Sequence, residues 1–99
     1  MRSHVERVPI PLAGELDLAC AAEVGAALDA AVAQVTGTVV CIDCAQLEFI
    51  DSSGLALLLR IDAQLKQDGR SMVLLRVPKQ LHRVFTITGV DHLIGSSVP

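Results

Sequence analysis

Aromatic residues are scarce in this sequence, which has two phenylalanines and neither tryptophan nor tyrosine among its 99 residues. Proteins that bind single-stranded nucleic acid stack bases on aromatic side chains and track the backbone with a positively charged groove. The formal net charge here is −3, which is opposite to the basic character of a nucleic-acid-binding domain. We therefore expect no nucleic-acid partner.

The sequence also lacks a long apolar run. No segment approaches the roughly 20 apolar residues of a membrane-spanning helix. Near the start, Glu6, Arg7, Glu15 and Asp17 interrupt the apolar stretch that a secretory signal peptide would need. The three cysteines are an odd number, which favours reduced thiols over a disulfide framework. These features predict a cytoplasmic protein with no membrane partner.

What the chain has in abundance is aliphatic side chains. Hydrophobic residues make up 52% of it, and with so few aromatics among them the core must consist of leucine, valine, isoleucine and alanine. A chain of this length is typical of one domain with one core. We therefore expect residues 1–99 to form a single domain.

Apolar spacing, together with glycine and proline, divides the chain into short strands and helices. We expect an edge strand within 5–14 and buried strands at 38–43 and 72–77. The predicted helices cover 16–37, 53–68 and 79–88, and a last short strand covers 90–94. Asp17 is the expected cap of the first helix and Gly37 its stop. This order predicts an α/β domain whose two buried strands run parallel across a right-handed crossover.

The segment Asp51-Ser52-Ser53-Gly54 lies at the start of the most regular predicted helix. An Asp or Ser there can cap the helix, which contributes about 1 kcal/mol. One cap residue is enough, however, and a glycine in the first turn costs about 1 kcal/mol relative to alanine. Gly54 would leave the helix start accessible, and the positive end of a helix favours an anion such as a serine-borne phosphate. On the residues alone, both a cap and a phosphate-bearing site remain open.

Catalytic and metal-binding interpretations find less support. A serine nucleophile on a strand-to-helix turn requires G-x-S-x-G, which the residues from Ile50 to Gly54 do not supply. An aspartyl-phosphate site at Asp51 needs a further acidic pair to hold a metal, and the preceding strand offers only Asp43. Cys41 and Cys44 form one C-x-x-C at a strand end, which is more typical of buried core thiols. We expect no catalytic residue, no metal and no cofactor.

Four segments, in order along the chain, resemble the STAS domain family, which includes bacterial anti-sigma factor antagonists and domains of sulfate transporters. The segment DSSGLALLLR, 51–60, is similar to the family signature, and LAGELD, 12–17, to its N-terminal G-E-L-D. The segments 69–85 and 88–94 resemble its glycine–strand–proline–helix unit and its closing T-G-[LV] turn with a short strand.

The resemblance implies a mixed sheet of four or five strands with about three packed helices. It also implies that Ser52, directly after Asp51, is the phospho-acceptor of an anti-sigma factor antagonist. The unphosphorylated family member binds an anti-sigma factor, usually also a GHKL-type serine kinase, and so frees a sigma factor. Phosphorylation breaks this complex, and a PP2C-type phosphatase restores it. The family often has an additional N-terminal strand, so the few residues before Gly14 indicate a shortened first hairpin.

The helix after the motif carries a candidate partner surface. Ser53 and Gly54 are expected to support the phospho-site. Leu55 and Leu59 lie on a flank outside the main apolar stripe, so we expect them either to contact the partner or to pack under a neighbouring element. The alternative functions are a non-switching STAS interaction or sensory subunit, a cytosolic STAS domain of an anion transporter, and a small hydrolase.

Overall fold

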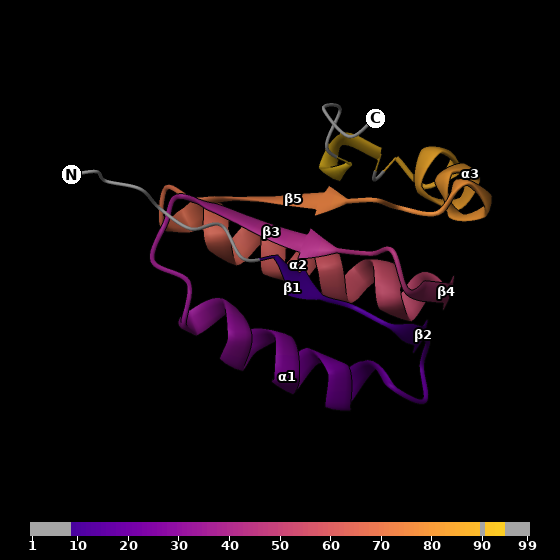
Figure 1. The fold of residues 1–99 in the computed structure, drawn as a ribbon, viewed down its shortest axis with the longest axis horizontal. Helices are drawn as coiled ribbons and strands as arrows, with labels where there is room; N and C mark the ends of the chain where they lie inside the picture. Colours follow the sequence, from indigo (N-terminus) through magenta and orange to yellow (C-terminus); the bar gives the residue numbers. More distant parts are fainter. Residues whose placement is uncertain (1–8, 90, 95–99) are drawn as a thin grey trace.

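The computed structural model describes residues 9–89 and 91–94, in which short strands alternate with three α-helices (Figure 1). In chain order the elements are β1 (Ile10–Pro11), β2 (Gly14–Leu16), α1 (Ala21–Ala33), β3 (Val39–Asp43), β4 (Leu47–Ile50), α2 (Ser52–Gln67), β5 (Ser71–Leu75), α3 (Lys79–Ile87) and the 3-10 helix η1 (Asp91–Leu93). The predicted α/β class is confirmed, as are three helices near the predicted places.

Two sets of parallel strands form the sheet layer. One sheet has the order β1–β3–β5, with Ile42 of β3 opposite Leu74 of β5. The other set pairs β2 with β4 and places Leu16 opposite Ile50. The predicted parallel pairing of the two central strands is confirmed. Every strand pair within residues 9–89 is parallel, so the antiparallel strand of a mixed sheet is not found in that range.

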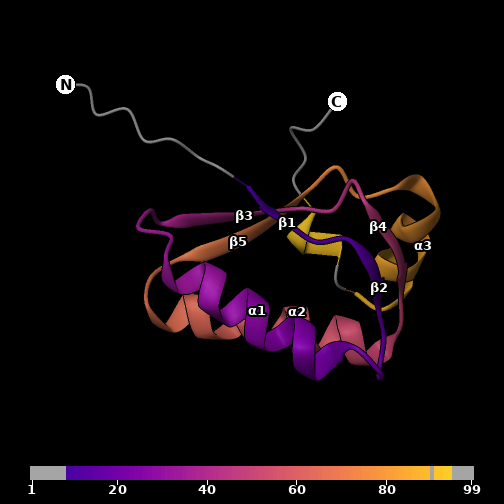
Figure 2. The ribbon, with the colours of Figure 1, turned by 60° about the horizontal axis from the view of Figure 1, so that its bottom comes forward.

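Helices α1 and α2 lie side by side and cover one face of the β1–β3–β5 sheet (Figures 1 and 2). Along β3 and β5, fully buried residues alternate with half-buried ones, because the two faces are covered unequally. Among the described residues the core is mostly aliphatic, and its other members are Cys44, Met72 and Phe85. Its side chains with no exposed surface are Leu16, Val40, Ile42, Cys44, Leu58, Leu74 and Phe85.

The predicted edge strand is shorter than expected and is interrupted. Residues 5–8 of that prediction lie outside the described part of the chain. From Ile10 the chain forms β1, and the Leu12 N–H still donates to the carbonyl of Asp43 at 2.9 Å. Gly14 then adopts a φ of 79° and donates to the carbonyl of Gln46 at 2.9 Å. The bend at this glycine moves the chain from β3 to the next strand, β4.

Two further expectations for strands were wrong. Between the predicted strand 38–43 and the predicted helix 53–68, where no strand was expected, the chain forms β4, in which Leu47 and Ile50 are buried while Glu48 and Phe49 are exposed. This pattern is neither a strict alternation nor a continuous apolar run, so periodicity did not identify the strand. The last strand, predicted over 90–94, is replaced by η1 and a single bridge between Ile94 and Leu74. Val90 lies outside the described residues.

Helix α1 is shorter at both ends than predicted. The Asp17 carboxylate accepts a hydrogen bond from the Cys20 N–H at 3.1 Å, so it stabilises the turn before the helix. The N-cap position is Cys20, whose side chain makes no capping bond. The helix ends at Ala33, well before Gly37. The N–H of Gln34 bonds to the carbonyl of Ala31 at 3.1 Å and that of Val35 to the carbonyl of Val32 at 3.1 Å, so both bonds span three residues instead of the four of an α-helix. Asp17 and Gly37 therefore flank the helix without being its cap and stop.

Cys41 and Cys44 lie in or beside the core, whereas Cys20 occupies the N-cap position of α1. Cys44 follows β3 and has no exposed surface, and this burial raises the pKa of its thiol to about 12. Cys41 is half-buried within β3. All three cysteines are free. The prediction of a buried core thiol is confirmed for Cys44.

Candidate functional site

Asp51 caps helix α2 and also holds the chain that follows β2. Its Oδ1 accepts hydrogen bonds from the N–H groups of Ser53 at 2.9 Å and Gly54 at 3.1 Å. Its Oδ2 accepts a hydrogen bond from the N–H of Leu18 at 3.2 Å. The predicted cap is confirmed, and one carboxylate joins two segments that are distant in sequence.

Ser52 is the first residue of α2, and its side chain is exposed, whereas that of Ser53 is half-buried. The N–H groups of Ser53 and Gly54 already bond to Asp51, so a phosphate on Ser52 would lie beside that carboxylate without replacing it. The helix dipole favours negative charge at this end. Of the two adjacent serines, Ser52 therefore has the more accessible hydroxyl.

Gly54 does not serve as an open approach to the helix start, as the sequence had suggested. The residue is buried, and a Cβ added to it would lie 2.3 Å from the carbonyl oxygen of Leu16. The same atom would lie 2.7 Å from Cγ of Leu16 and 2.8 Å from Cγ1 of Ile50. Glycine is needed here because α2 begins directly against the β2–β4 pair. This close packing fixes the first turn of α2, which carries Ser52, against β2 and β4.

The two leucines proposed for the partner surface have different environments. Leu55 is 5% exposed and belongs to the core, so it packs inside and does not reach a partner. Leu59 is 39% exposed on the same helix. Helical periodicity placed both leucines on one flank of α2. It could not show that other elements of the fold cover Leu55, in the first turn, more completely than Leu59.

Two exposed apolar residues close to the motif were missed by the sequence analysis. Leu18 is 77% exposed, and its N–H bonds to the Asp51 carboxylate next to Ser52. Phe49 is 48% exposed and lies two residues before Asp51, opposite Glu15 in the β2–β4 pair. Phe49 could have been suspected as an aromatic directly before the motif. Leu18 carried no such signal, because its position depends on the pairing of β2 with β4.

The first part of the chain is acidic and the rest is more basic. Between Arg7 and Arg60 the sequence contains no lysine or arginine. The acidic residues in this interval are Glu15, Asp17, Glu23, Asp29, Asp43, Glu48 and Asp51. Glu15 and Glu48 are both exposed on β2–β4, and neither forms an ion pair within the described residues. A phosphate on Ser52 would thus join a surface that is already negative.

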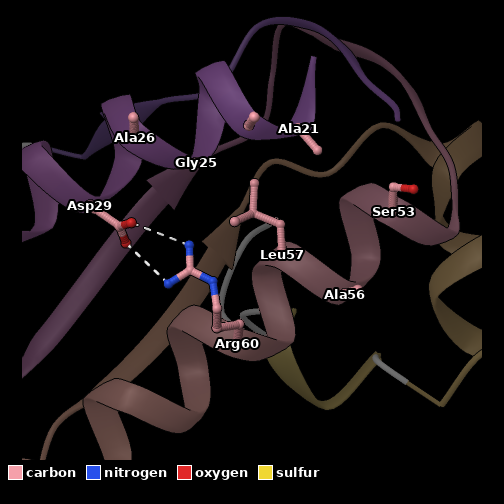
Figure 3. A pocket seen from close by; sticks show the side chains of 9 residues that line it. Ala21, Gly25, Ala26, Asp29, Ser53, Ala56, Leu57 and Arg60 are labelled. Atoms are coloured by element: carbon pink, nitrogen blue, oxygen red, sulfur yellow. Dashed lines mark hydrogen bonds and ion pairs between the residues drawn. The ribbon is translucent and has the colours of Figure 1, made fainter. Parts of the chain in front are cut away.

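A groove of about 510 Å³ runs between α1 and α2 from Ser53 to Arg60 (Figure 3). Small side chains make it shallow: its lining residues are Ala21, Ala22, Gly25, Ala26, Asp29, Ser53, Ala56, Leu57 and Arg60. At its far end the guanidinium of Arg60 bonds to the carboxylate of Asp29, with the closer contact at 3.2 Å (Figure 3). This ion pair closes the groove and ties the two helices together.

The remaining titratable groups in the described part of the chain do not assemble a second site. The described histidines bond to backbone carbonyls, His82 to Val77 at 3.0 Å and His92 to Gly89 at 3.2 Å. Across residues 9–89 and 91–94, no group of three or more His, Cys, Asp or Glu residues is placed to hold a metal ion. None of the helices in these ranges has the length and apolarity needed to cross a membrane.

Comparison with known proteins identifies the family. The family model described as "Mlab, STAS domain" matches residues 1–95. The chain belongs to the STAS domain family. The resemblance seen in the motif segments is thus confirmed over nearly the whole chain.

Individual STAS proteins agree with this assignment. The anti-sigma-B factor antagonists of Listeria monocytogenes and Listeria innocua are each 34% identical over 90 residues, which is 90% of this chain and 77% of theirs. The unphosphorylated form of the anti-sigma factor antagonist SpoIIAA superposes with a TM-score of 0.73 at 28% identity, covering 94% of this chain and 83% of SpoIIAA. The phosphorylated form of the Bacillus cell fate determinant SpoIIAA has a TM-score of 0.65, with coverages of 94% and 86%. The chain is therefore similar to STAS proteins that are known with and without a phosphate.

Proposed function

We propose that this STAS protein is an anti-sigma factor antagonist switched by phosphorylation of Ser52. Its unphosphorylated form binds an anti-sigma factor and so releases a sigma factor, without catalysing a reaction. The observation that carries the proposal is that Ser52 is exposed at the start of α2. Its neighbours are fixed in place, because Asp51 caps the helix and Gly54 is buried against β2 and β4. The names of the similar proteins, two of them antagonists of anti-sigma-B factor, support the same function.

The exposed position of Ser52 supports a mechanism in which one phosphate switches binding. A phosphoserine carries a charge of about −1.5 to −2 at neutral pH. The protein tolerates this charge at a helix start, but an apolar partner surface packed over Leu18 and Phe49 would have to remove water from the phosphate. A penalty of about 3 kcal/mol weakens binding by about a hundredfold. The switch therefore acts on the complex and leaves the fold intact.

The proposal assigns the other components by their chemistry. The partner that adds the phosphate is an anti-sigma factor with GHKL-type serine kinase activity, and a PP2C-type phosphatase removes it. Asp51 shapes the acceptor site together with the backbone N–H of Ser53, and Leu59 extends the partner surface along α2. Sigma factors act on RNA polymerase in the cytoplasm, so the proposal places this single STAS domain there.

The acceptor is tested by phosphorylation in vitro. The protein is incubated with ATP and the anti-sigma kinase encoded nearest to its gene, and the phosphate is mapped by mass spectrometry. We expect one phosphate on Ser52, its loss in Ser52→Ala, and normal labelling of the matched control Ser53→Ala. A phosphate on Ser53, or labelling of Ser52→Ala at the wild-type rate, would refute the assignment.

A further inference from the structure

Helix α3 presents a basic and apolar stripe on its outer side. Lys79, Arg83 and Ile87 are spaced four residues apart, so they lie along one side of the helix. The opposite side carries Leu81 and Phe85, which are buried in the core. Ile87 is 75% exposed, so this stripe displays an apolar side chain next to two cations. We call Lys79, Arg83 and Ile87 the α3 stripe.

The cations of the α3 stripe differ from the others in the described chain. Arg60, Lys66 and Arg76 each form an ion pair with a carboxylate, and Arg70 donates to the carbonyls of Val35 and Gly37. Lys79 and Arg83 form no ion pair within residues 9–89 and 91–94. Within the described residues, the α3 stripe is thus where lysine and arginine side chains are left without a carboxylate partner.

A surface of complementary chemistry lies on the same molecule. The exposed charged and large apolar residues of the β2–β4 pair and the turn after it are Glu15, Leu18, Glu48 and Phe49. We call them the β2–β4 surface. Two unpaired carboxylates beside two exposed apolar side chains match two unpaired cations beside Ile87. Both views of the fold place α3 and the β2–β4 pair at the same end of the molecule (Figures 1 and 2).

We propose that two copies of this chain associate through these surfaces, the α3 stripe of each facing the β2–β4 surface of the other. Because both surfaces lie at one end, a two-fold axis makes the two contacts equivalent and closes the assembly as a dimer instead of a filament. Charge complementarity selects the orientation, and the apolar side chains lose water on contact.

The dimer has a consequence for regulation, which rests on the proposed anti-sigma function. Association covers Leu18 and Phe49, which flank Ser52, so it competes with the anti-sigma factor for the same surface. Formation of the dimer requires neither the kinase nor the anti-sigma factor. Its existence can therefore be tested on the isolated protein, and a failed dimer test would leave the Ser52 switch untouched.

The experiment measures self-association of the full chain by sedimentation over a range of concentrations. We expect a monomer–dimer equilibrium that weakens as salt is raised from about 0.05 M to about 0.5 M, because salt screens exposed charges. Lys79→Glu with Arg83→Glu should weaken the dimer by about tenfold or more, and Glu15→Lys with Glu48→Lys should do the same. An equimolar mixture of these two variants should associate again, since both contacts then join opposite charges.

Several results would overturn the proposal. A wild-type protein that stays monomeric at all concentrations would do so, as would a dimer that neither double variant weakens. Failure of the mixed variants to associate, with both folded by circular dichroism, would also contradict it. Binding of the monomer to phosphatidylglycerol vesicles through Lys79 and Arg83 would instead assign the α3 stripe to an anionic membrane surface.

Discussion

The carboxylate of Asp51 accepts a hydrogen bond from the N–H of Leu18 at 3.2 Å while its other oxygen caps α2. The residue beside the proposed phospho-acceptor therefore also positions Leu18, the most exposed large apolar side chain among the described residues, close to it. Two segments of the site, one after β2 and one at the start of α2, are held as one surface by a single side chain.

This arrangement predicts two effects of Asp51→Ala. Loss of the cap should lower the free energy of unfolding by about 1–2 kcal/mol, measured by urea denaturation. Loss of the Oδ2 contact should also speed hydrogen exchange of the Leu18 amide. Ser53→Ala is the matched control, because no described hydrogen bond uses its hydroxyl, and it should change neither quantity appreciably. Equal exchange of Leu18 in wild type and Asp51→Ala would contradict the dual role.

Gly54→Ala gives a prediction opposite to that from helix propensity. Propensity alone predicts stabilisation by about 1 kcal/mol, because alanine is the better helix former. The new Cβ, however, would lie 2.3 Å from the backbone oxygen of Leu16, so we expect destabilisation by about 3 kcal/mol.

Gly37→Ala is the matched control for this substitution. A Cβ at Gly37 meets no atom within 4 Å, so this variant should lie within about 0.5 kcal/mol of wild type or be slightly more stable. Urea denaturation of both variants measures the difference. A stable Gly54→Ala protein would show that α2 does not begin as close to β2 as described.

The ion pair between Asp43 and Arg76 predicts a dependence of stability on pH. Arg76 donates to both carboxylate oxygens of Asp43, which lowers the pKa of that carboxyl below its ordinary value of 3.8. The pair therefore stabilises the fold above that pH, and its contribution is lost as the pH falls toward the lower folded pKa.

Arg76→Gln should accordingly have a lower free energy of unfolding than wild type near neutral pH. This difference between the two proteins should disappear on acidification. The free energy of unfolding is measured from about pH 3 to about pH 7, where the titration of a carboxyl falls. In an Asp43→Asn background the same Arg76→Gln change should show no such pH dependence. A gap that stayed constant with pH in the wild-type background would exclude the pair as its cause.

The exposed residues near Ser52 predict which substitutions weaken the partner complex. Leu18→Ala and Phe49→Ala should each weaken binding of the anti-sigma factor by about fivefold or more, because each removes apolar surface that would lose water on contact with the partner. The free energy of unfolding should change little for Leu18→Ala, since Leu18 is 77% exposed in the free protein, and somewhat more for Phe49→Ala, since Phe49 is 48% exposed. Leu59→Ala tests whether the surface extends along α2. Binding is measured by calorimetry, and unchanged affinity in both Leu18→Ala and Phe49→Ala would place the interface elsewhere.

The sequence predicted α2 closely because several local signals agree there. The cap at Asp51, the apolar spacing and the stop at Gly69 place the helix at 53–68, against Ser52–Gln67 in the structure. The strand β4 was missed because half of its four residues face outward next to each other. Short segments of this kind are identified by their pairing partner, which local periodicity does not contain.

The same distinction between local and long-range information explains why only part of the site was predicted. Asp51 and Ser52 follow from local chemistry and from the family motif. The roles of Gly54 and Leu55 did not, because they depend on how closely α2 approaches β2 and on what covers its flank. Leu18 became part of the site only through the long-range hydrogen bond to Asp51.

The central claim is tested most directly by the affinity of the anti-sigma factor for the two forms of this protein. Phosphorylated protein and untreated protein are compared by calorimetry, together with Ser52→Asp and the control Ser53→Asp. We predict that a phosphate on Ser52 weakens binding by about a hundredfold, while circular dichroism shows an unchanged fold. Equal affinity of the phosphorylated and unphosphorylated forms would contradict the account.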